Sequence, residues 1–126
     1  MSDAFDKGMA VRRRTLGDAH VDAAGKTTTD LDAGFQDMIT ETAWGRVWAG
    51  DHWTPRERSV VTLALLASQG HWDEFAMHLR ATTNTGASAE DIRETLMHVA
   101  IYAGVPAANK GFKIAKDVLA EMASDA

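Results

Sequence analysis

Three side chains that can carry protons share one face of a predicted helix. His71, Glu74 and His78 follow one another at spacings of three and four residues, which places them within about 60° of each other on a helix. A carboxylate between two imidazoles can transfer protons or contribute to a metal site. A metal site is the weakest interpretation, since no second helix offers a paired Glu-x-x-His arrangement. A solvated polar face is the simplest, and the pattern alone leaves these alternatives open.

Arginines are the candidate anchors for an anionic ligand. Arg80 lies about 180° from His71 on the same helix, so it reaches the pocket of His78 only if that pocket wraps the helix or a second subunit contributes. Arg56 and Arg58 occupy the first turn of the preceding helix, where cations oppose the helix dipole. A bound anion would offset that mismatch. Arg58, nearest the apolar run, is therefore a candidate anchor, with an ordinary solvated arginine as the alternative.

Two tryptophans and two further histidines have simpler explanations. Trp44 and Trp48 are spaced as packing residues of one helix face, although large rings also form the walls of ligand pockets. His20 is expected in a flexible loop. It could close over a site, but exposure to solvent is the simpler interpretation. His98, beside Tyr102, is expected to be structural.

The element that must position these side chains is a central helix over residues 54–70. Val60 to Ala67 is apolar at every position except Thr62, and an all-round apolar run predicts burial on nearly every side. The capping signal Thr54–Glu57 begins the helix and Gly70 ends it. About 15 residues at 1.5 Å each span roughly 22 Å, too short to cross a bilayer.

The other apolar patterns also have helical spacing, and no segment shows sustained alternation of period two. The sequence therefore predicts an all-α fold of six helices. A surplus of apolar faces indicates an oligomer, because an obligate interface resembles a core cut in half. Besides the central helix, the predicted helices cover residues 3–16, 30–44 (capped by Asp30 and interrupted at Gly45), 71–83, 88–103 (opened by the capping box Ser88–Asp91) and 106–122, and residues 17–29 are expected to be irregular.

Composition narrows the function classes. The chain has 126 residues, 45% of them hydrophobic and 25% charged, which is typical of one soluble domain over residues 1–126. It contains no cysteine, which excludes disulfides and thiol chemistry. The net charge of −5, without a basic stripe, makes nucleic acid an unsuitable partner. The first 16 residues lack a signal-peptide pattern, so we expect a cytoplasmic protein. We expect no membrane partner.

Several motifs together identify a resemblance to a known family. The chain resembles the carboxymuconolactone decarboxylase family over nearly its whole length. A wider superfamily of alkylhydroperoxidase-like helical domains includes peroxidases with a Cys-x-x-Cys-x-x-x-His motif, but the two cysteine positions are His71 and Glu74 here. The resemblance therefore does not imply peroxidase activity. The matching motifs are Gly8–Arg13, Leu16–Asp22, Ala43–Trp48, Arg58–Ser59, His78–Ala81, Asn84–Gly86 and Ala100–Asn109.

The resemblance implies a cofactor-independent carboxy-lyase. It would convert γ-carboxymuconolactone, a small anionic lactone, to β-ketoadipate enol-lactone in the degradation of protocatechuate. It also implies a homo-oligomer, commonly a hexamer, without a metal. On this hypothesis His78 and Glu74 are catalytic. Arg58 and Arg80 would bind the substrate carboxylates, and Trp44 and Trp48 would line the pocket.

Two other functions fit the same residues. The chain could be a catalytically silent relative that binds a small ligand or serves as an assembly subunit. It could also decarboxylate a different small lactone or keto acid, since the sequence does not fix the shape of the pocket. Adding purified protein to the lactone and following CO₂ release discriminates between turnover and silent binding.

Overall fold

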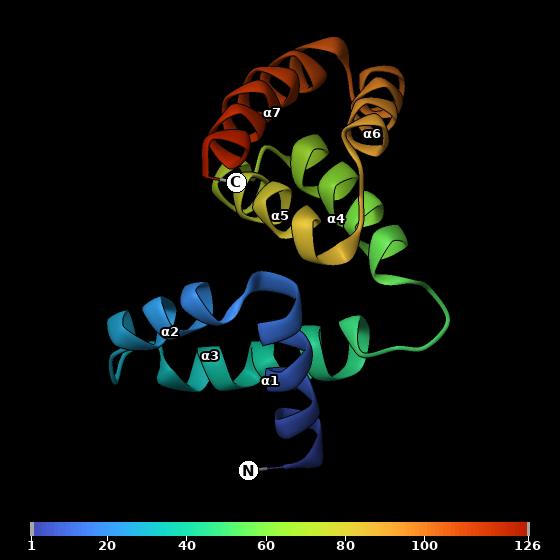
Figure 1. The fold of residues 1–126 in the computed structure, drawn as a ribbon. Coiled ribbons are helices and arrows are strands. Elements are labelled where there is room, and N and C mark those ends of the chain that lie inside the picture. The colour runs from blue at the N-terminus through green and yellow to red at the C-terminus, as the bar shows by residue number, and fades with distance from the viewer. Residues whose placement is uncertain (1, 126) are drawn as a thin grey trace. The chain divides into compact units, whose positions relative to one another are not determined.

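A computed structural model describes residues 2–125 as helices joined by short connections, with no strand among them (Figure 1). The predicted all-α class is confirmed. The chain divides after Pro55 into two compact units, which are described separately below. The helices are α1 (Asp3–Leu16), α2 (Asp18–Thr27), α3 (Ala33–Ile39), the π-helix η1 (Thr40–Trp48), α4 (Pro55–Gln69), α5 (Trp72–Thr85), α6 (Ala89–Tyr102) and α7 (Val105–Asp125).

In the N-terminal unit, α1 packs against η1 with their backbones almost in contact (Figure 1). A Cβ atom added to Gly8 would lie 2.0 Å from the carbonyl oxygen of Thr40, and one added to Gly45 would lie 2.2 Å from that of Ala4. Neither position can therefore accept a side chain without separating the two helices. The sequence suggested that Gly45 interrupts the helix, but η1 continues through it to Trp48. The absence of a side chain at Gly45 allows the close approach of α1.

Residues 17–29 contain a helix where the sequence predicts an irregular connection. Gly17, with φ of 91°, ends α1 and directly precedes α2, so the sharp turn needs one residue only. His20 therefore lies on a helix, exposed, and not in a loop. The low apolar content of this segment hid α2, which buries only Val21. The expected irregular connection is wrong.

The next helix begins later than predicted and changes its winding. α3 begins at Ala33 after Asp32, whose carboxylate accepts a hydrogen bond from the Thr29 backbone N–H at 2.8 Å, so the expected cap at Asp30 is wrong. The hydroxyls of Thr40 and Thr42 donate to backbone carbonyls four residues earlier, at 2.8 Å each. Such bonds compete with the α-helical ladder, and the wider π-helix η1 begins at this point.

The C-terminal unit is built around one core shared by α4, α5, α6 and α7 (Figure 1). α6 and α7 pack closely, and Gly111 of α7 lets the side chain of Leu96 approach its backbone. The capping box predicted at Ser88 is confirmed: the Ser88 hydroxyl accepts from the Asp91 backbone N–H at 3.1 Å, and the Asp91 carboxylate accepts from the Ser88 N–H at 2.8 Å. The buried core consists of Leu63, Ala67, Phe75, Leu79, Ile92, Leu96, Val99, Ala108, Ala115 and Val118.

The central helix α4, predicted to be buried on nearly every side, is not buried on every side within one chain. Leu63 and Ala67 face the core, but Leu65 is 53% exposed and Val61 is also exposed. Only one face of α4 packs on the core of its own unit. None of the helices in the described part of the chain is long and apolar enough to cross a membrane.

Candidate functional site

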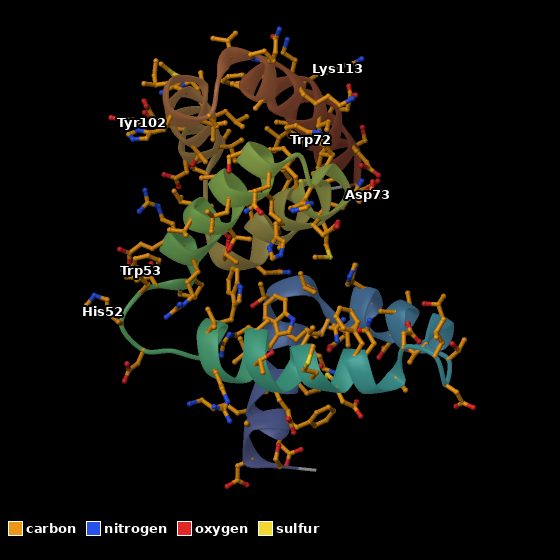
Figure 2. The ribbon with its side chains drawn as sticks, turned by 180° about the vertical axis from the view of Figure 1, so that it is seen from behind. His52, Trp53, Trp72, Asp73, Tyr102 and Lys113 are labelled. Carbon is orange, nitrogen blue, oxygen red and sulfur yellow. The ribbon has the colours of Figure 1, made fainter. Side chains whose placement is uncertain are left out.

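The candidate proton donor, His78, lies on the buried face of α5. Its side chain is 7% exposed, and its helix neighbours Phe75, Leu79 and Thr82 are buried with it. Trp72, in the first turn, meets the ring of Phe75 edge-on with centroids 5.5 Å apart, and Figure 2 labels Trp72 where α5 begins. The aromatic contact and the buried stripe hold this face of α5 against the core, so the imidazole of His78 is sheltered from bulk solvent.

Glu74 lies one turn before His78 but is exposed. It contributes a negative charge to the first turn of α5, where the helix dipole favours acids. Among the described residues it has no hydrogen-bond or ion-pair partner, so its carboxylate does not hydrogen-bond to His78 in this structure. His71, the third member of the predicted face, is exposed at the N-cap and makes no side-chain capping bond.

A buried hydrogen bond joins the helix of Arg58 to the helix of His78. The hydroxyls of Ser59 on α4 and Thr85 on α5 lie 2.6 Å apart, and both side chains are buried. Thr85 and His78 are seven residues apart, so both lie on one face of α5, roughly 10 Å apart along its axis. Arg58, next to Ser59, is half-buried. The structure therefore places His78 and Arg58 in the same compact unit.

The other two arginines already have acidic partners. Arg80 is exposed and pairs with Glu121 of α7 at 3.1 Å. Arg56 donates to both carboxylate oxygens of Asp91, at 2.9 and 2.5 Å. Hydrogen bonds from Arg56 and from the Ser88 backbone lower the pKa of Asp91 from 3.8 to about 2. An anion was expected near Arg56 and Arg58 at the start of α4. For Arg56, that anion is the carboxylate of Asp91.

Trp44 and Trp48 stack on successive turns of η1 in the N-terminal unit. Their ring centroids are 5.2 Å apart and the rings are tilted by 36°. Trp44 is buried and Trp48 half-buried. The two rings therefore contact each other on one face of η1, four residues apart.

A cavity of about 240 Å³ lies inside the N-terminal unit, and neither His78 nor Arg58 lines it. Arg12 of α1 is its buried cation, 9% exposed. The guanidinium donates to the hydroxyl of Thr40 and to the side-chain oxygen of Gln36, each at 3.3 Å. Apolar side chains from α1 and α2 form much of the remaining wall. The lining residues are Phe5, Met9, Arg12, Val21, Ala24, Gly25, Thr28, Ala33, Gln36, Asp37 and Thr40.

Arg12 is a functional candidate that the sequence analysis passes over. Burial lowers the pKa of its guanidinium, because a charged group loses its hydration there. The signal was available: Gly8, Val11, Arg12 and Thr15 form the buried stripe of α1, with Arg12 one turn after Gly8. Arg13, by contrast, forms ion pairs with Asp18 and Asp22 near the surface.

No three His, Asp or Glu side chains within residues 2–125 converge as a group that could hold a metal ion.

Comparison with known proteins decides the family. The model of the carboxymuconolactone decarboxylase family matches residues 33–117. The chain belongs to this family. A 4-carboxymuconolactone decarboxylase from Acinetobacter baylyi is 36% identical over 118 residues, covering 94% of this chain and 88% of that protein. The resemblance inferred from the motifs is confirmed.

Two further proteins are similar to this chain. The nitrosuccinic acid decarboxylase npaB of Metarhizium robertsii is 34% identical over 118 residues, covering 94% of this chain and 82% of that protein. A 4-carboxymuconolactone decarboxylase from Pseudomonas putida is 51% identical over 41 residues, covering 32% of this chain and 85% of that sequence. Each of the three relatives is named as a decarboxylase.

Proposed function

We propose that this chain decarboxylates γ-carboxymuconolactone to β-ketoadipate enol-lactone, without a cofactor, in the degradation of protocatechuate. The observation that carries the proposal is a sheltered imidazole, His78, in a chain that matches a 4-carboxymuconolactone decarboxylase over 94% of its length. The match with this relative supports the reaction. His78 is our candidate for the acid that protonates the ring carbon in the last step.

The substrate makes an added electron acceptor unnecessary. Its ring carbon carries both a carboxylate and an acetate arm. When the bond to the carboxylate breaks and CO₂ leaves, the electron pair moves through the ring double bond onto the lactone carbonyl oxygen. A proton then adds to the ring carbon next to that carbonyl, which gives the enol-lactone. The protein must anchor the acetate arm, stabilise the negative oxygen and deliver one proton.

His78 is the proposed proton donor or partner of the negative oxygen, and Glu74 is proposed to share the proton. A histidine changes charge near neutral pH, so it can give up a proton and regain it in each cycle. Glu74 does not touch His78 in the described structure, and we therefore place its contribution in the substrate complex, where catalytic contacts often tighten. The i, i+4 spacing of the two residues on α5 supports this arrangement.

Arg58 is the better of the two proposed carboxylate anchors. A guanidinium binds a carboxylate through two parallel hydrogen bonds. Arg58 is half-buried, where such a pair is less screened by solvent than at the surface. Arg80 would have to exchange Glu121 for the substrate, so we assign it a secondary role. Trp44 and Trp48 are proposed as apolar walls, because large aromatic rings commonly line ligand pockets.

The test is the reaction itself, with purified protein and γ-carboxymuconolactone, followed by CO₂ release. His78→Ala should lower kcat by about 10²–10⁴-fold, the usual contribution of a positioned acid or base, and should change KM much less. His52→Ala is the matched control, because His52 is exposed in the connection before α4 (Figure 2). Unchanged kcat in His78→Ala would remove His78 from the mechanism.

A second candidate substrate comes from the fungal relative named as a nitrosuccinic acid decarboxylase. Nitrosuccinic acid also carries two carboxylates and its own electron acceptor, since the nitro group takes the electron pair released with CO₂. The same anchor and the same acid would serve both compounds. Comparing kcat/KM for the two substrates decides between them, because the true substrate should gain from contacts along its whole length.

The non-enzymatic alternative is a catalytically silent protein that binds a small ligand or serves as an assembly subunit. It predicts binding of the lactone with no CO₂ release. The three relatives named as decarboxylases argue against it. Binding without turnover at high protein concentration would nevertheless favour it.

We also propose that the chain forms a homo-oligomer, with a hexamer as the first state to test. The support is an apolar surface at the junction of α6 and α7, where Ile101 is 76% exposed, Tyr102 81% and Val105 65%; Figure 2 shows Tyr102 at the end of α6. Apolar patches of this kind mark interaction surfaces. Ile101→Glu should reduce the mass measured by light scattering, whereas Lys113→Glu, at an exposed position of α7, should not.

We also retain three predictions, on domain organisation, cellular location and nucleic-acid binding. The family match spans the division after Pro55, which supports treating residues 1–126 as one domain of an alkylhydroperoxidase-like fold. A cytoplasmic location fits a pathway of small anionic metabolites. A net charge of −5 disfavours nucleic acid as a partner.

A further inference from the structure

The cavity of the N-terminal unit contains a buried cation without an acidic partner. Arg12 is 9% exposed, and none of the described acids forms an ion pair with it. Burial alone shifts its pKa. A buried charge is costly unless an opposite charge and well-formed hydrogen bonds offset the loss of hydration. The surface ion pairs of neighbouring Arg13 show that acids are within reach of α1, yet none serves Arg12.

The hydrogen bonds of Arg12 are few and long. A guanidinium has five N–H donors, and Arg12 uses two of them on neutral acceptors, Thr40 and Gln36, each at 3.3 Å. Its Nε is buried and has no acceptor among the described residues. Because a guanidinium only donates, it must face the side-chain oxygen of Gln36. Gln36 lines the cavity, and its amide nitrogen is the donor that the bond to Arg12 leaves unused.

We propose that this cavity is a binding site for a small carboxylate ligand, with Arg12 as its charged anchor and Gln36 as a neutral donor. A carboxylate matches the forked donors of an arginine, and a space of about 240 Å³ suits a compact acid of few carbons. Apolar residues such as Phe5, Met9 and Val21 would surround the carbon skeleton. The site goes beyond the proposed decarboxylation, because the N-terminal unit forms it without His78.

One acid lines the same cavity and sets a further condition. Asp37 would repel an anion, but its side chain is exposed, so solvent screens its charge more than that of Arg12. Removing that charge should therefore strengthen carboxylate binding. A cation site would respond in the opposite direction.

The experiment uses the full chain with succinate as the probe and succinamide as an uncharged analogue, at constant ionic strength set with NaCl. Succinate should raise the unfolding temperature and shift the Nε–H signal of Arg12 in ¹H–¹⁵N spectra, and succinamide should do neither. Arg12→Gln should weaken succinate binding at least tenfold. Arg14→Gln, at the exposed position two residues later, should bind as the wild type does. Asp37→Asn should bind about two- to fivefold more tightly.

A second variant keeps the test decisive if Arg12→Gln does not fold. Ala24→Phe retains Arg12 but fills the cavity from α2, so it should abolish the succinate-dependent shift. Equal stabilisation of Arg12→Gln and wild type by succinate would overturn the proposal, as would equal effects of succinate and succinamide. Repeating the titration with Arg58→Gln separates the two proposals: succinate binding should persist in a protein whose KM for the lactone has risen.

Discussion

Replacing Gly8 with alanine tests how closely α1 must approach η1. The added Cβ would lie 2.0 Å from the Thr40 carbonyl oxygen and 2.8 Å from the Gly45 nitrogen, both backbone atoms. Ordinary van der Waals contact begins at 3.4 Å, so the nearer atom is 1.4 Å too close. A backbone carbonyl cannot rotate away as a side chain can, and the helices must therefore separate.

Two opposing terms set the size of the effect. Alanine favours a helix interior over glycine by about 0.5–1 kcal/mol. Overpacking a close contact costs about 1–3 kcal/mol and occasionally more, and a backbone clash belongs at the upper end. We therefore expect Gly8→Ala to lose about 1–2 kcal/mol net, which lowers the unfolding temperature by roughly 4–8 °C.

Urea unfolding followed by circular dichroism measures this loss. Gly34→Ala is the matched control, because a Cβ at Gly34 of α3 meets nothing within 4 Å, and it should stabilise the protein by about 0.5–1 kcal/mol. The opposite signs of the two changes are the specific expectation. If Gly8→Ala were as stable as Gly34→Ala, the close approach of the two helices would be refuted.

Three further perturbations follow from the C-terminal unit. The pKa of Asp91 is lowered to about 2. Its pairing with Arg56 therefore stabilises the fold above pH 4, and this stabilisation is lost as the pH falls towards 2. Arg56→Gln should raise the pH at the midpoint of acid unfolding, measured by circular dichroism. Ser59→Ala leaves the buried Thr85 hydroxyl without its partner and should cost about 1–3 kcal/mol in urea unfolding, with a smaller loss when Thr85→Val is added. Arg58→Gln should raise KM for the lactone at least tenfold with a smaller change in kcat; unchanged KM would exclude it as the anchor.

Strong local signals predicted much of the fold. The helix over residues 3–16 and the capping box at Ser88 follow directly from the sequence, since caps and apolar spacing act locally. α2 could not be found in this way, because a helix that buries one valine has almost no apolar stripe. The π-helix η1 was hidden as well, because the spacing of apolar residues does not reveal a change of helical winding.

The candidate site shows a similar division. The position of His78 on α5 follows from helical spacing, but its burial, and the exposure of Glu74 one turn away, depend on how α5 packs. Arg12 is the first of three consecutive arginines, and only the tertiary structure distinguishes its buried guanidinium from the more exposed ones of Arg13 and Arg14. Partners such as Glu121 for Arg80 lie 41 residues away, beyond the reach of local patterns.

The placement of the indole rings has a practical optical consequence. The paired rings of Trp44 and Trp48 lie in the N-terminal unit, whereas Trp72 begins α5 in the other. Emission from a Trp72→Phe protein would come from the N-terminal unit, which also contains Trp53. Emission from a protein with Trp44, Trp48 and Trp53 all replaced by Phe would come from Trp72 at the start of α5. The fluorescence of this enzyme family member can thus be divided between its halves, so that a ligand entering either half leaves a distinguishable spectral trace.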